Sequence, residues 1–313
     1  MNYKKLILIG GLGYLGGRIA EYFSKLGNYE VIITTRRNSK DFPENNLFNT
    51  KIVQFDFRSA LISEDLFNDC HSVIYLSSPS ASECLKYLQL IIEENIRNVK
   101  QVLMLADKGR AKNFIYFSSI HVYGENLVGE VTEGTLPKPN HPYGISHKLA
   151  EDEILDFKFV KPVNRYILRL SNCYGYPFWM RSNCWDLVIN DICRMAIQDH
   201  EIVLKSPKAK RDFISINNIL DSLMKLINGE YSGKGGVMNL CSGQNISILE
   251  KTKSIQSILK NNYQLKSNVF LKPNGSNNKA YSLGSTVKPS KNFDKNELYE
   301  LKNLVEKCME MET

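Results

Sequence analysis

The sequence predicts an α/β protein built on a doubly wound parallel sheet. Two patterns predict this fold. Short apolar runs end in glycine or small polar residues, and helical stretches separate one such run from the next. This alternation places ligands at the carboxyl ends of the strands. The chain has 313 residues, 43% of them hydrophobic, which is enough for a full core in one large or two small domains.

The expected elements follow in order along the chain. Strands are expected at 5–9, 30–35, 52–56, 72–77, 113–117 and 237–240, and helices at 18–26, 83–107, 143–159, 185–198, 215–227 and 296–311. Residues 272–294 are rich in Asn, Ser, Gly and Lys and are expected to form a long loop. Because the helix at 215–227 should return to the first domain, we predict a discontinuous first domain of residues 1–172 with 213–246. The second domain is then 173–212 with 247–313.

The composition and net charge of the chain disfavour several classes of function. No apolar run is long enough to span a bilayer, and the apolar stretch near the N-terminus runs straight into glycines, which favours a first strand over a signal peptide. Seven scattered cysteines form no CxxC pair and no metal spacing, so we expect no metal site and a reducing cytoplasm. The net charge of +7 is dispersed, which favours an anionic small molecule over nucleic acid or a membrane.

A glycine triplet follows the first strand. Gly10 allows a tight turn, Gly13 lets the backbone approach a pyrophosphate, and Gly16 lets the next helix pack on the strand. The N–H groups at the start of that helix would face the phosphates. Because the triplet lies between an expected strand and an expected helix, it predicts a dinucleotide site. The alternative is an ordinary strand–helix turn.

Residues at the ends of the next strands are further candidates for this site. Arg36 stands near the position of the acidic residue that usually binds a ribose 2′-hydroxyl, so it could bind a 2′-phosphate or stack on adenine. Asp56 could accept from an adenine amino group, or be a turn carboxylate. Because Arg36 fits either cofactor, NAD(H) and NADP(H) are near-equal candidates. The candidate cofactor-binding residues are Gly10, Gly13, Tyr14, Leu15, Gly16, Arg36, Asp56, Phe57, Leu76, Ser77, Tyr143 and His147.

Two strings carry candidate catalytic residues. Ser119 lies at the carboxyl end of the fifth strand, and Tyr143 opens a helix after a proline-rich loop. His147 shares the helix face of Tyr143, whereas Lys148 is rotated by about 100° from it. A tyrosine needs help to ionise, and a neighbouring hydroxyl can provide a hydrogen bond. A purely structural Tyr–Ser hydrogen bond is the alternative.

These strings together resemble the extended short-chain dehydrogenase/reductase family of nucleotide-sugar enzymes. Besides the glycine triplet, the resemblance rests on Ser118-Ser-Ile-His-Val-Tyr-Gly124, Pro142-Tyr-Gly-Ile-Ser146, Arg169-Leu-Ser-Asn-Cys-Tyr-Gly175, Arg211-Asp-Phe-Ile-Ser-Ile216 and Asn239-Leu-Cys-Ser-Gly243, which occur in the family's order. About seventy C-terminal residues lack a clear match.

The resemblance implies a Rossmann-type domain that binds NAD or NADP, with NAD(H) first, and a smaller C-terminal domain that binds a nucleotide sugar. It implies that Tyr143 exchanges a proton with a sugar hydroxyl and that Ser119 hydrogen-bonds the same oxygen. Asn172 and Arg211 would contact the sugar diphosphate, although Arg211 could also form a structural pair with an aspartate. Ser78 and His121 complete the candidate substrate site. The family also pairs through its long helices, here 83–107 and 143–159, which implies a homodimer or homotetramer.

The first departure from the family pattern is at the lysine that normally follows the tyrosine by four residues. Here that position is His147, and Lys148 could enter the site only through a helix irregularity. A histidine is charged only when its pKa allows, so we expect weaker acidification of Tyr143 and an activity profile that leans to alkaline pH.

The second departure narrows the chemistry. Sugar 4,6-dehydratases of the family carry Asp-Glu where this chain has Ile120 and His121. Without that acid and base we expect no 4,6-dehydration. Oxidation at C4, epimerisation at C4 and reduction of a 4-keto sugar remain, with oxidation preferred.

Residues 36–39 resemble GDP-mannose dehydratases, which suggests a GDP-hexose or GDP-heptose of polysaccharide biosynthesis. A Rossmann-type binding protein that has lost catalysis is the alternative from another class.

Overall fold

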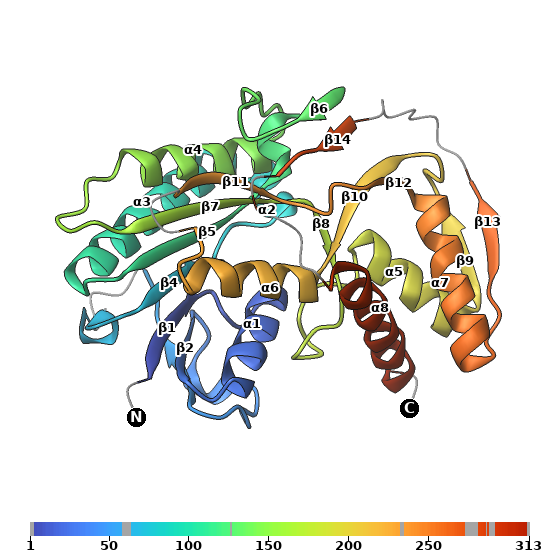
Figure 1. Ribbon diagram of the computed structural model, residues 1–313, viewed down its shortest axis with the longest axis horizontal. Helices are drawn as coiled ribbons and strands as arrows, with labels where there is room; N and C mark the ends of the chain where they lie inside the picture. Colours follow the sequence, from blue (N-terminus) through green and yellow to red (C-terminus); the bar gives the residue numbers. More distant parts are fainter. Residues whose placement is uncertain are drawn as a thin grey trace.

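A seven-stranded parallel sheet forms the centre of the protein (Figure 1). The computed structural model describes residues 3–57, 64–125, 127–231, 235–272, 281–285, 287 and 292–311. The strands are β1 (Lys4–Ile9), β2 (Tyr29–Thr35), β3 (Thr50–Gln54), β4 (Ser72–Tyr75), β5 (Asn113–Ser119), β7 (Asn164–Leu170) and β11 (Gly236–Leu240). Their order is β11-β7-β5-β4-β1-β2-β3, and every neighbouring pair is parallel. This confirms the predicted Rossmann-type α/β fold.

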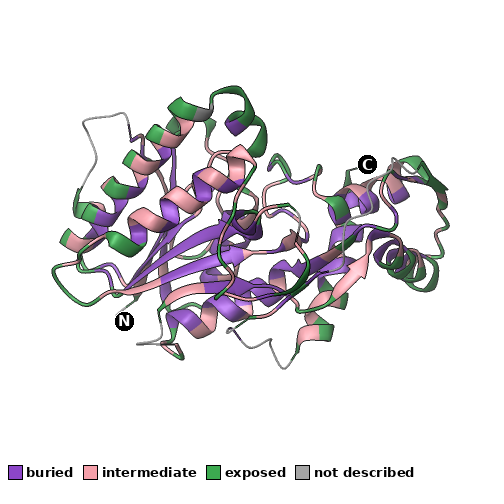
Figure 2. Ribbon diagram, turned by 90° about the horizontal axis from the view of Figure 1, so that it is seen from above, coloured by how far each residue is buried: buried purple, intermediate pink, exposed green. Residues whose placement is uncertain are grey.

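Helices cover both faces of this sheet. α1 (Tyr14–Lys25) and α6 (Ile216–Ile227) lie on one face, and α2 (Ala81–Lys86), α3 (Leu88–Lys108) and α4 (Pro142–Asp156) lie on the other (Figure 1). The strands alternate their apolar side chains between two separate cores, one for each helical layer. The strands are therefore buried on both sides, between helices whose outer faces are exposed (Figure 2).

A second group of elements packs beside the carboxyl ends of the sheet. β8 (Asn172–Tyr174), β10 (Lys210–Ser215) and β12 (Asn245–Ser247) form a small sheet, and β9 (Glu201–Leu204) pairs with β13 (Asn268–Leu271). α5 (Val188–Arg194), a π-helical turn (Met195–Asp199), α7 (Ile248–Tyr263) and α8 (Phe293–Glu310) share a third core with these strands. β6 (Gly129–Val131) pairs with β14 (Tyr281–Leu283), and short 3₁₀ helices span Ser39–Asp41, Glu64–Phe67 and Ile120–Tyr123.

Several predicted elements differ from the structure. α1 begins at residue 14, not 18, because Gly16 lets the helix pass so close to the preceding turn that a Cβ there would lie 2.4 Å from the Gly11 carbonyl oxygen. The helix predicted at 83–107 is broken at Tyr87, whose φ of −139° and ψ of 47° are not helical. The strand β7 was not predicted.

The remaining differences lie in the C-terminal half. The helix expected at 185–198 begins at Val188 and ends in the π-helical turn. Within the loop expected at 272–294, β14 forms and α8 already begins at Phe293, while residues 273–280, 286 and 288–291 lie outside the described residues. The predicted domain boundaries at 172, 213 and 246 fall within β8, β10 and β12, which all belong to the small sheet, so the division stays a prediction. No described helix has the length and apolar character needed to cross a membrane.

One buried ion pair joins the two groups of elements. Arg18 of α1 and Glu300 of α8 are 2% and 0% exposed, and their side chains approach to 2.6 Å. The guanidinium also lies 3.5 Å from the ring centroid of Tyr176 and donates to its carbonyl oxygen at 3.0 Å. Burial raises the pKa of Glu300, and Arg18 opposes that shift. The pair therefore fixes the helix that follows the glycine triplet against the C-terminal elements.

We expect Arg18→Met to reduce the free energy of unfolding by about 3–5 kcal/mol at pH 7, because it leaves the Glu300 carboxylate buried without a cation. The pKa of Glu300 in the folded variant should rise further above its unfolded value, so the loss should shrink as the pH falls toward that unfolded value. Urea unfolding at pH 7 and pH 5 measures both effects.

Lys25→Met is the matched control on the same helix. Lys25 pairs with Glu21 at 2.7 Å, but its side chain is 70% exposed, so we expect a loss below about 1 kcal/mol. Equal losses for the two variants would contradict the role assigned to the buried pair.

Candidate active site

The turn between β1 and α1 forms a glycine cradle. The N–H groups of Gly10, Gly11 and Gly13 are bonded to Thr34 and Gly10, so the donors left for a ligand are those of the first turn of α1. Gly10 has φ +76°, and a Cβ on it would lie 2.9 Å from the Cβ of Ser77, so only glycine fits there. Gly13 is exposed, and an added Cβ would meet only the Gly10 carbonyl oxygen at 3.5 Å. The first turn of α1 has no acidic residue and no side-chain cap. This donor set fits the pyrophosphate of a dinucleotide.

A cavity of about 540 Å³ adjoins the cradle. It combines apolar walls with an arginine edge, which suits an adenosine. It is lined by Ile9, Gly10, Leu12, Gly13, Thr34, Thr35, Arg36, Arg37, Phe55, Phe57, Leu76, Ser77 and Ser78. Six of the predicted cofactor-binding residues are among them, together with Ser78, which was predicted to contact substrate. The other lining residues belong to the same strands or come shortly after them. Their position near the ends of the strands was the only feature of the sequence that could have indicated a role at this site.

Other predicted cofactor residues are placed differently. The Tyr14 hydroxyl donates to the Gly175 carbonyl oxygen at 2.7 Å, so its side chain contacts the C-terminal elements and only its backbone N–H remains for a phosphate. Leu15 packs against the core, and Gly16 is buried where α1 crosses the turn. Asp56 is not among the described lining residues, although both of its neighbours are.

A second cavity, of about 250 Å³, brings four predicted residues together: Ser119, His121, Tyr143 and Asn172. Its other lining residues are Ser118, Ile120, Leu170, Ser171, Cys173, Asp186, Leu187, Val188, Ile189 and Phe213. Four of these, residues 186–189, lie just before α5 and in its first turn, and the sequence did not single them out as site residues. The cavity lies where β5, β8 and α4 meet, so residues far apart in sequence share one wall.

Local capping sets the positions of the two candidate catalytic groups. The Ser119 hydroxyl ends β5 and accepts from the backbone N–H of His121 at 3.3 Å. Tyr143 is the second residue of α4, and its backbone N–H donates to Nδ1 of His141, the N-cap residue, at 3.2 Å. Burial raises the pKa of Tyr143 to about 12, and a hydrogen bond with Ser119 acts in the opposite direction.

His147 lies beside Tyr143 but is neutral. The two rings pack edge to face with centroids 4.5 Å apart. Burial lowers the pKa of His147 to about 3, so it carries no charge at neutral pH. Lys148 forms an ion pair with Asp152 one turn along α4. The regular helix therefore turns Lys148 toward Asp152, which lends no support to the possibility that Lys148 enters the site.

Asp212 organises the predicted diphosphate end. It accepts from the Ser171 hydroxyl at 2.6 Å, the Ser242 hydroxyl at 2.8 Å and the Gly243 N–H at 2.8 Å, and its carbonyl oxygen accepts from the Asn172 amide at 2.9 Å. Three of the strings found in the sequence thus meet at one buried carboxylate. The sequence did not single out Asp212, because its partners are distant along the chain.

Arg211 is not among the described residues that line the 250 Å³ cavity. Its guanidinium donates to the Lys210 carbonyl oxygen at 2.9 Å. Burial raises the pKa of Tyr281, and the positive charge of Arg211 opposes this shift, so Arg211 and Tyr281 belong to the same neighbourhood. A diphosphate role for Arg211 stays a prediction.

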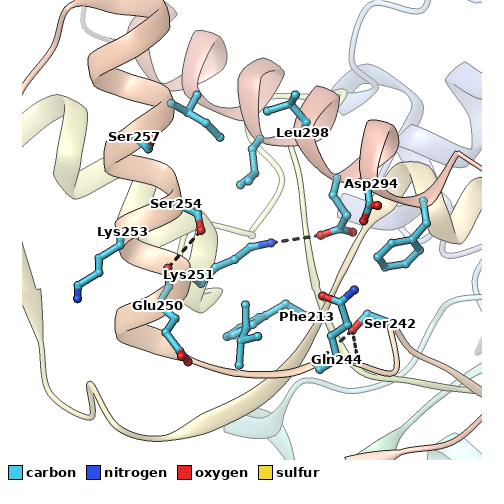
Figure 3. Close-up of a pocket in the computed structure, with 15 residues that line it drawn as sticks. Phe213, Ser242, Gln244, Glu250, Lys251, Lys253, Ser254, Ser257, Asp294 and Leu298 are labelled. Atoms are coloured by element: carbon cyan, nitrogen blue, oxygen red, sulfur yellow. Dashed lines mark hydrogen bonds and ion pairs between the residues drawn. The ribbon is translucent and has the colours of Figure 1, made fainter.

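A larger cavity, of about 760 Å³, lies between α7 and α8 (Figure 3). Lys251 and Glu297, which both line it, form an ion pair at 3.2 Å, and Lys251 also donates to the Tyr174 hydroxyl at 3.1 Å. No predicted site residue lines it, and its central charges already pair with each other. The 250 Å³ cavity, which contains Tyr143, is therefore the better candidate for chemistry.

Comparisons with known proteins identify the family of the chain. A model of the NAD dependent epimerase/dehydratase family matches residues 6–241. UDP-glucuronic acid decarboxylase 6 of Arabidopsis thaliana is 22% identical over 273 residues, which are 84% of this chain and 76% of that protein. Probable UDP-arabinose 4-epimerase 1 of Oryza sativa subsp. japonica is 28% identical over 189 residues, 55% of this chain and 44% of that protein, so the match spans less than half of that relative.

A solved structure has the same fold over nearly the whole chain. It is UDP-N-acetylglucosamine 4-epimerase from Methanobrevibacter ruminantium M1 in complex with UDP-N-acetylmuramic acid, with a TM-score of 0.78, 20% identity and coverage of 98% of this chain and 100% of that one. The match to an NAD dependent family confirms the prediction of NAD(H) as the cofactor. The three named proteins carry UDP-sugar names, so they lend no support to the predicted GDP-sugar.

We expect His147→Lys to lower the pKa of Tyr143 by about 1–3 units, because an ammonium group beside the phenol favours the phenolate. The wild-type phenol, with its pKa raised to about 12, should stay protonated through neutral pH and ionise only in strongly alkaline solution. NMR of the protein labelled with ¹³C at the tyrosine phenol carbon measures this ionisation directly.

Lys148→Met is the control, since Lys148 already pairs with Asp152 on the helix surface. It should leave the titration of Tyr143 unchanged. A shift with Lys148→Met and none with His147→Lys would overturn the assignment of these two positions.

Proposed function

The chain belongs to the NAD dependent epimerase/dehydratase family, and from this premise we propose that it oxidises and re-reduces C4 of a nucleotide-linked sugar, which inverts that centre. The observation that carries the proposal is the placement of Tyr143 and Ser119 in one cavity at the carboxyl end of the sheet that also holds the dinucleotide cradle. A substrate in this cavity would have its reacting carbon between a proton-transfer group and the cofactor site.

The residues of the chain account for the proton transfer in this reaction. The cofactor, when bound, supplies hydride acceptance and return at C4. Tyr143 accepts the proton of the C4 hydroxyl as the sugar is oxidised and gives it back as the sugar is reduced. Ser119 lowers the pKa of Tyr143 through its hydrogen bond, which favours the phenolate that this step needs. Asn172, whose amide donates to the carbonyl oxygen of Asp212, lines the same cavity and orients the substrate.

Epimerisation replaces oxidation as our preferred reaction. Oxidation alone would release a keto sugar and leave the cofactor reduced, whereas epimerisation returns the hydride. The names of two of the reported relatives favour the second outcome. The same relatives favour a UDP-linked sugar over the GDP-linked sugar predicted from residues 36–39. Reduction of a 4-keto sugar uses the same residues and remains the second candidate.

The wall beside Ser119 argues against 4,6-dehydration. Ile120 is 6% exposed and carries no titratable group, so it moves no proton. The centroid of the His121 ring lies 5.8 Å from that of the Tyr143 ring. The residue before His121 is Ile120, so the acidic pair of the dehydratases is missing at these two positions. We therefore propose that water elimination across C5 and C6 is not catalysed.

Incubation of the purified protein with UDP- and GDP-sugars, followed by NMR of the sugar ring, tests the reaction. We expect a C4 epimer from a UDP-sugar without net production of NADH. Mass spectrometry of the nucleotide released on denaturation should find NAD. A stable 4-keto product, or the absence of any change at C4 across a broad panel, would overturn epimerisation in favour of oxidation or of a binding protein.

Tyr143→Phe should reduce turnover by roughly 10²- to 10⁴-fold, the usual contribution of a positioned proton-transfer group, and leave cofactor content unchanged. Tyr75→Phe is a matched control, because Tyr75 is a buried strand tyrosine whose hydroxyl has no hydrogen-bond partner among the described residues. Turnover that survives Tyr143→Phe would exclude this mechanism.

We also propose that two copies of the chain pair through α3 and α4. Leu90 and Met104 of α3 are apolar but 57% and 54% exposed, and their separation of fourteen residues places them on one face of the helix. A Leu90→Lys, Met104→Lys variant should shift sedimentation from dimer or tetramer to monomer. Val160→Lys, at an 87% exposed position after α4, should not. A monomeric wild type would contradict the proposal.

A further inference from the structure

A small recess opens from the candidate cofactor site beside Arg36. Arg36 comes directly after β2 and lines the 540 Å³ cavity next to the glycine cradle. It also lines a recess of about 90 Å³, which shares Phe57, Ser77 and Ser78 with the larger cavity. Arg36 therefore stands at the border of the two spaces, and the charges of the recess act on whatever binds there.

Two carboxylates line this recess together with Arg36. Glu83 belongs to α2 and Glu94 to α3, and neither was singled out as a site residue from the sequence. Arg36 is the one cation among the described residues of the wall, so the recess carries more negative than positive charge. The remaining wall is uncharged and consists of Phe57, Ser77, Ser78, Pro79, Ile91, Asn95 and Asn98.

Local structure fixes both the position and the charge of Glu83. Ser80 is the N-cap of α2, and its hydroxyl and backbone N–H donate to Oε2 of Glu83 at 2.7 and 2.8 Å. These hydrogen bonds, together with the positive charge of Arg36, lower the pKa of Glu83, so its carboxyl group is ionised at neutral pH. Glu83 is also exposed, so a ligand at the recess can approach the carboxylate.

Glu94 differs from Glu83 because it has a cation on its own helix. Its side chain lies 3.9 Å from that of Arg97, one turn further along α3. Glu83 is therefore the carboxylate of the recess whose charge acts most directly on Arg36.

We propose that Glu83 is a specificity-determining residue that makes the protein bind NAD in preference to NADP. A 2′-phosphate carries a charge of about −1.5 to −2 at pH 7, so at Arg36 it would be repelled by Glu83 and would compete with it for the guanidinium. The adenine and the 2′-hydroxyl of NAD are uncharged, and an arginine whose charge is balanced can still stack on adenine. The acidic group that usually follows β2 is thus supplied here by α2.

The affinities of the two nucleotides test this role without any sugar. Displacement of bound NADH, followed by its fluorescence, gives the Kd of NAD and of NADP on the same protein. We expect wild type to bind NAD at least about 10-fold more tightly, and Glu83→Gln to reduce the ratio of the two Kd values roughly 5- to 30-fold, the range expected for removing one charge at this separation. Glutamine can replace glutamate in a capping box, so α2 should keep its start.

Glu93→Gln is the matched control. Glu93 is exposed on α3 and lines neither the recess nor the 540 Å³ cavity, so the same change of charge should leave the ratio of Kd values as it is in wild type.

Each outcome decides the proposal. A wild type that binds NADP as tightly as NAD overturns it even if Glu83→Gln does not fold. An unchanged ratio in Glu83→Gln, an equal change in Glu93→Gln, or no binding of either nucleotide does the same. The proposal depends on the cofactor and not on the proposed reaction, so the expected ratios together with no reaction at C4 of any sugar would refute only the proposed function.

Discussion

The arrangement of the candidate site depends on one buried ion pair, between Glu151 of α4 and Arg169 of β7. Both residues are nearly inaccessible to solvent, and the guanidinium binds the carboxylate through two hydrogen bonds of 3.0 and 2.6 Å. The same carboxylate accepts from the Ser118 hydroxyl at 2.6 Å. One residue thus ties α4 to β5 and β7, and it fixes the spacing between Tyr143 and Ser119. Because each charge would be costly to bury alone, the three elements hold one another in register.

Among the described residues, no cation lowers the pKa of Tyr143, because the nearby cations are paired elsewhere. Arg169 is paired with Glu151, Lys148 with Asp152, and Arg18 with Glu300. Each of these cations has a structural task, and His147 is too deeply buried to become one. Within the described part of the chain, the phenol of Tyr143 therefore has only the Ser119 hydrogen bond to offset its burial, which is why its pKa is raised.

Local pattern was enough to predict the fold. It also indicated four candidate residues that the structure brings into one cavity, namely Ser119, His121, Tyr143 and Asn172. The glycine triplet, the apolar strands and the Tyr143 helix each depend on residues a few positions apart, so one-dimensional spacing reveals them. The role of Asp212, the break at Tyr87 and the Arg18–Glu300 pair depend on contacts between distant segments. The neutrality of His147 was likewise hidden, because its cause is burial against Tyr116 and Tyr143. The alkaline profile expected from the missing lysine was inferred from residue type alone, and the raised pKa of Tyr143 agrees with it.

The candidate cofactor site carries its charged and polar donors at one end. The first turn of α1 offers backbone N–H groups, and Arg36 and Arg37 edge the 540 Å³ cavity. These donors would meet charged phosphates, and hydrogen bonds to charged groups are about twice as strong as neutral ones. Most of the affinity for the cofactor should therefore come from contacts with its pyrophosphate and adenosine. Contacts with the nicotinamide should serve mainly to orient that ring. Orientation is what hydride transfer in two directions at one carbon requires.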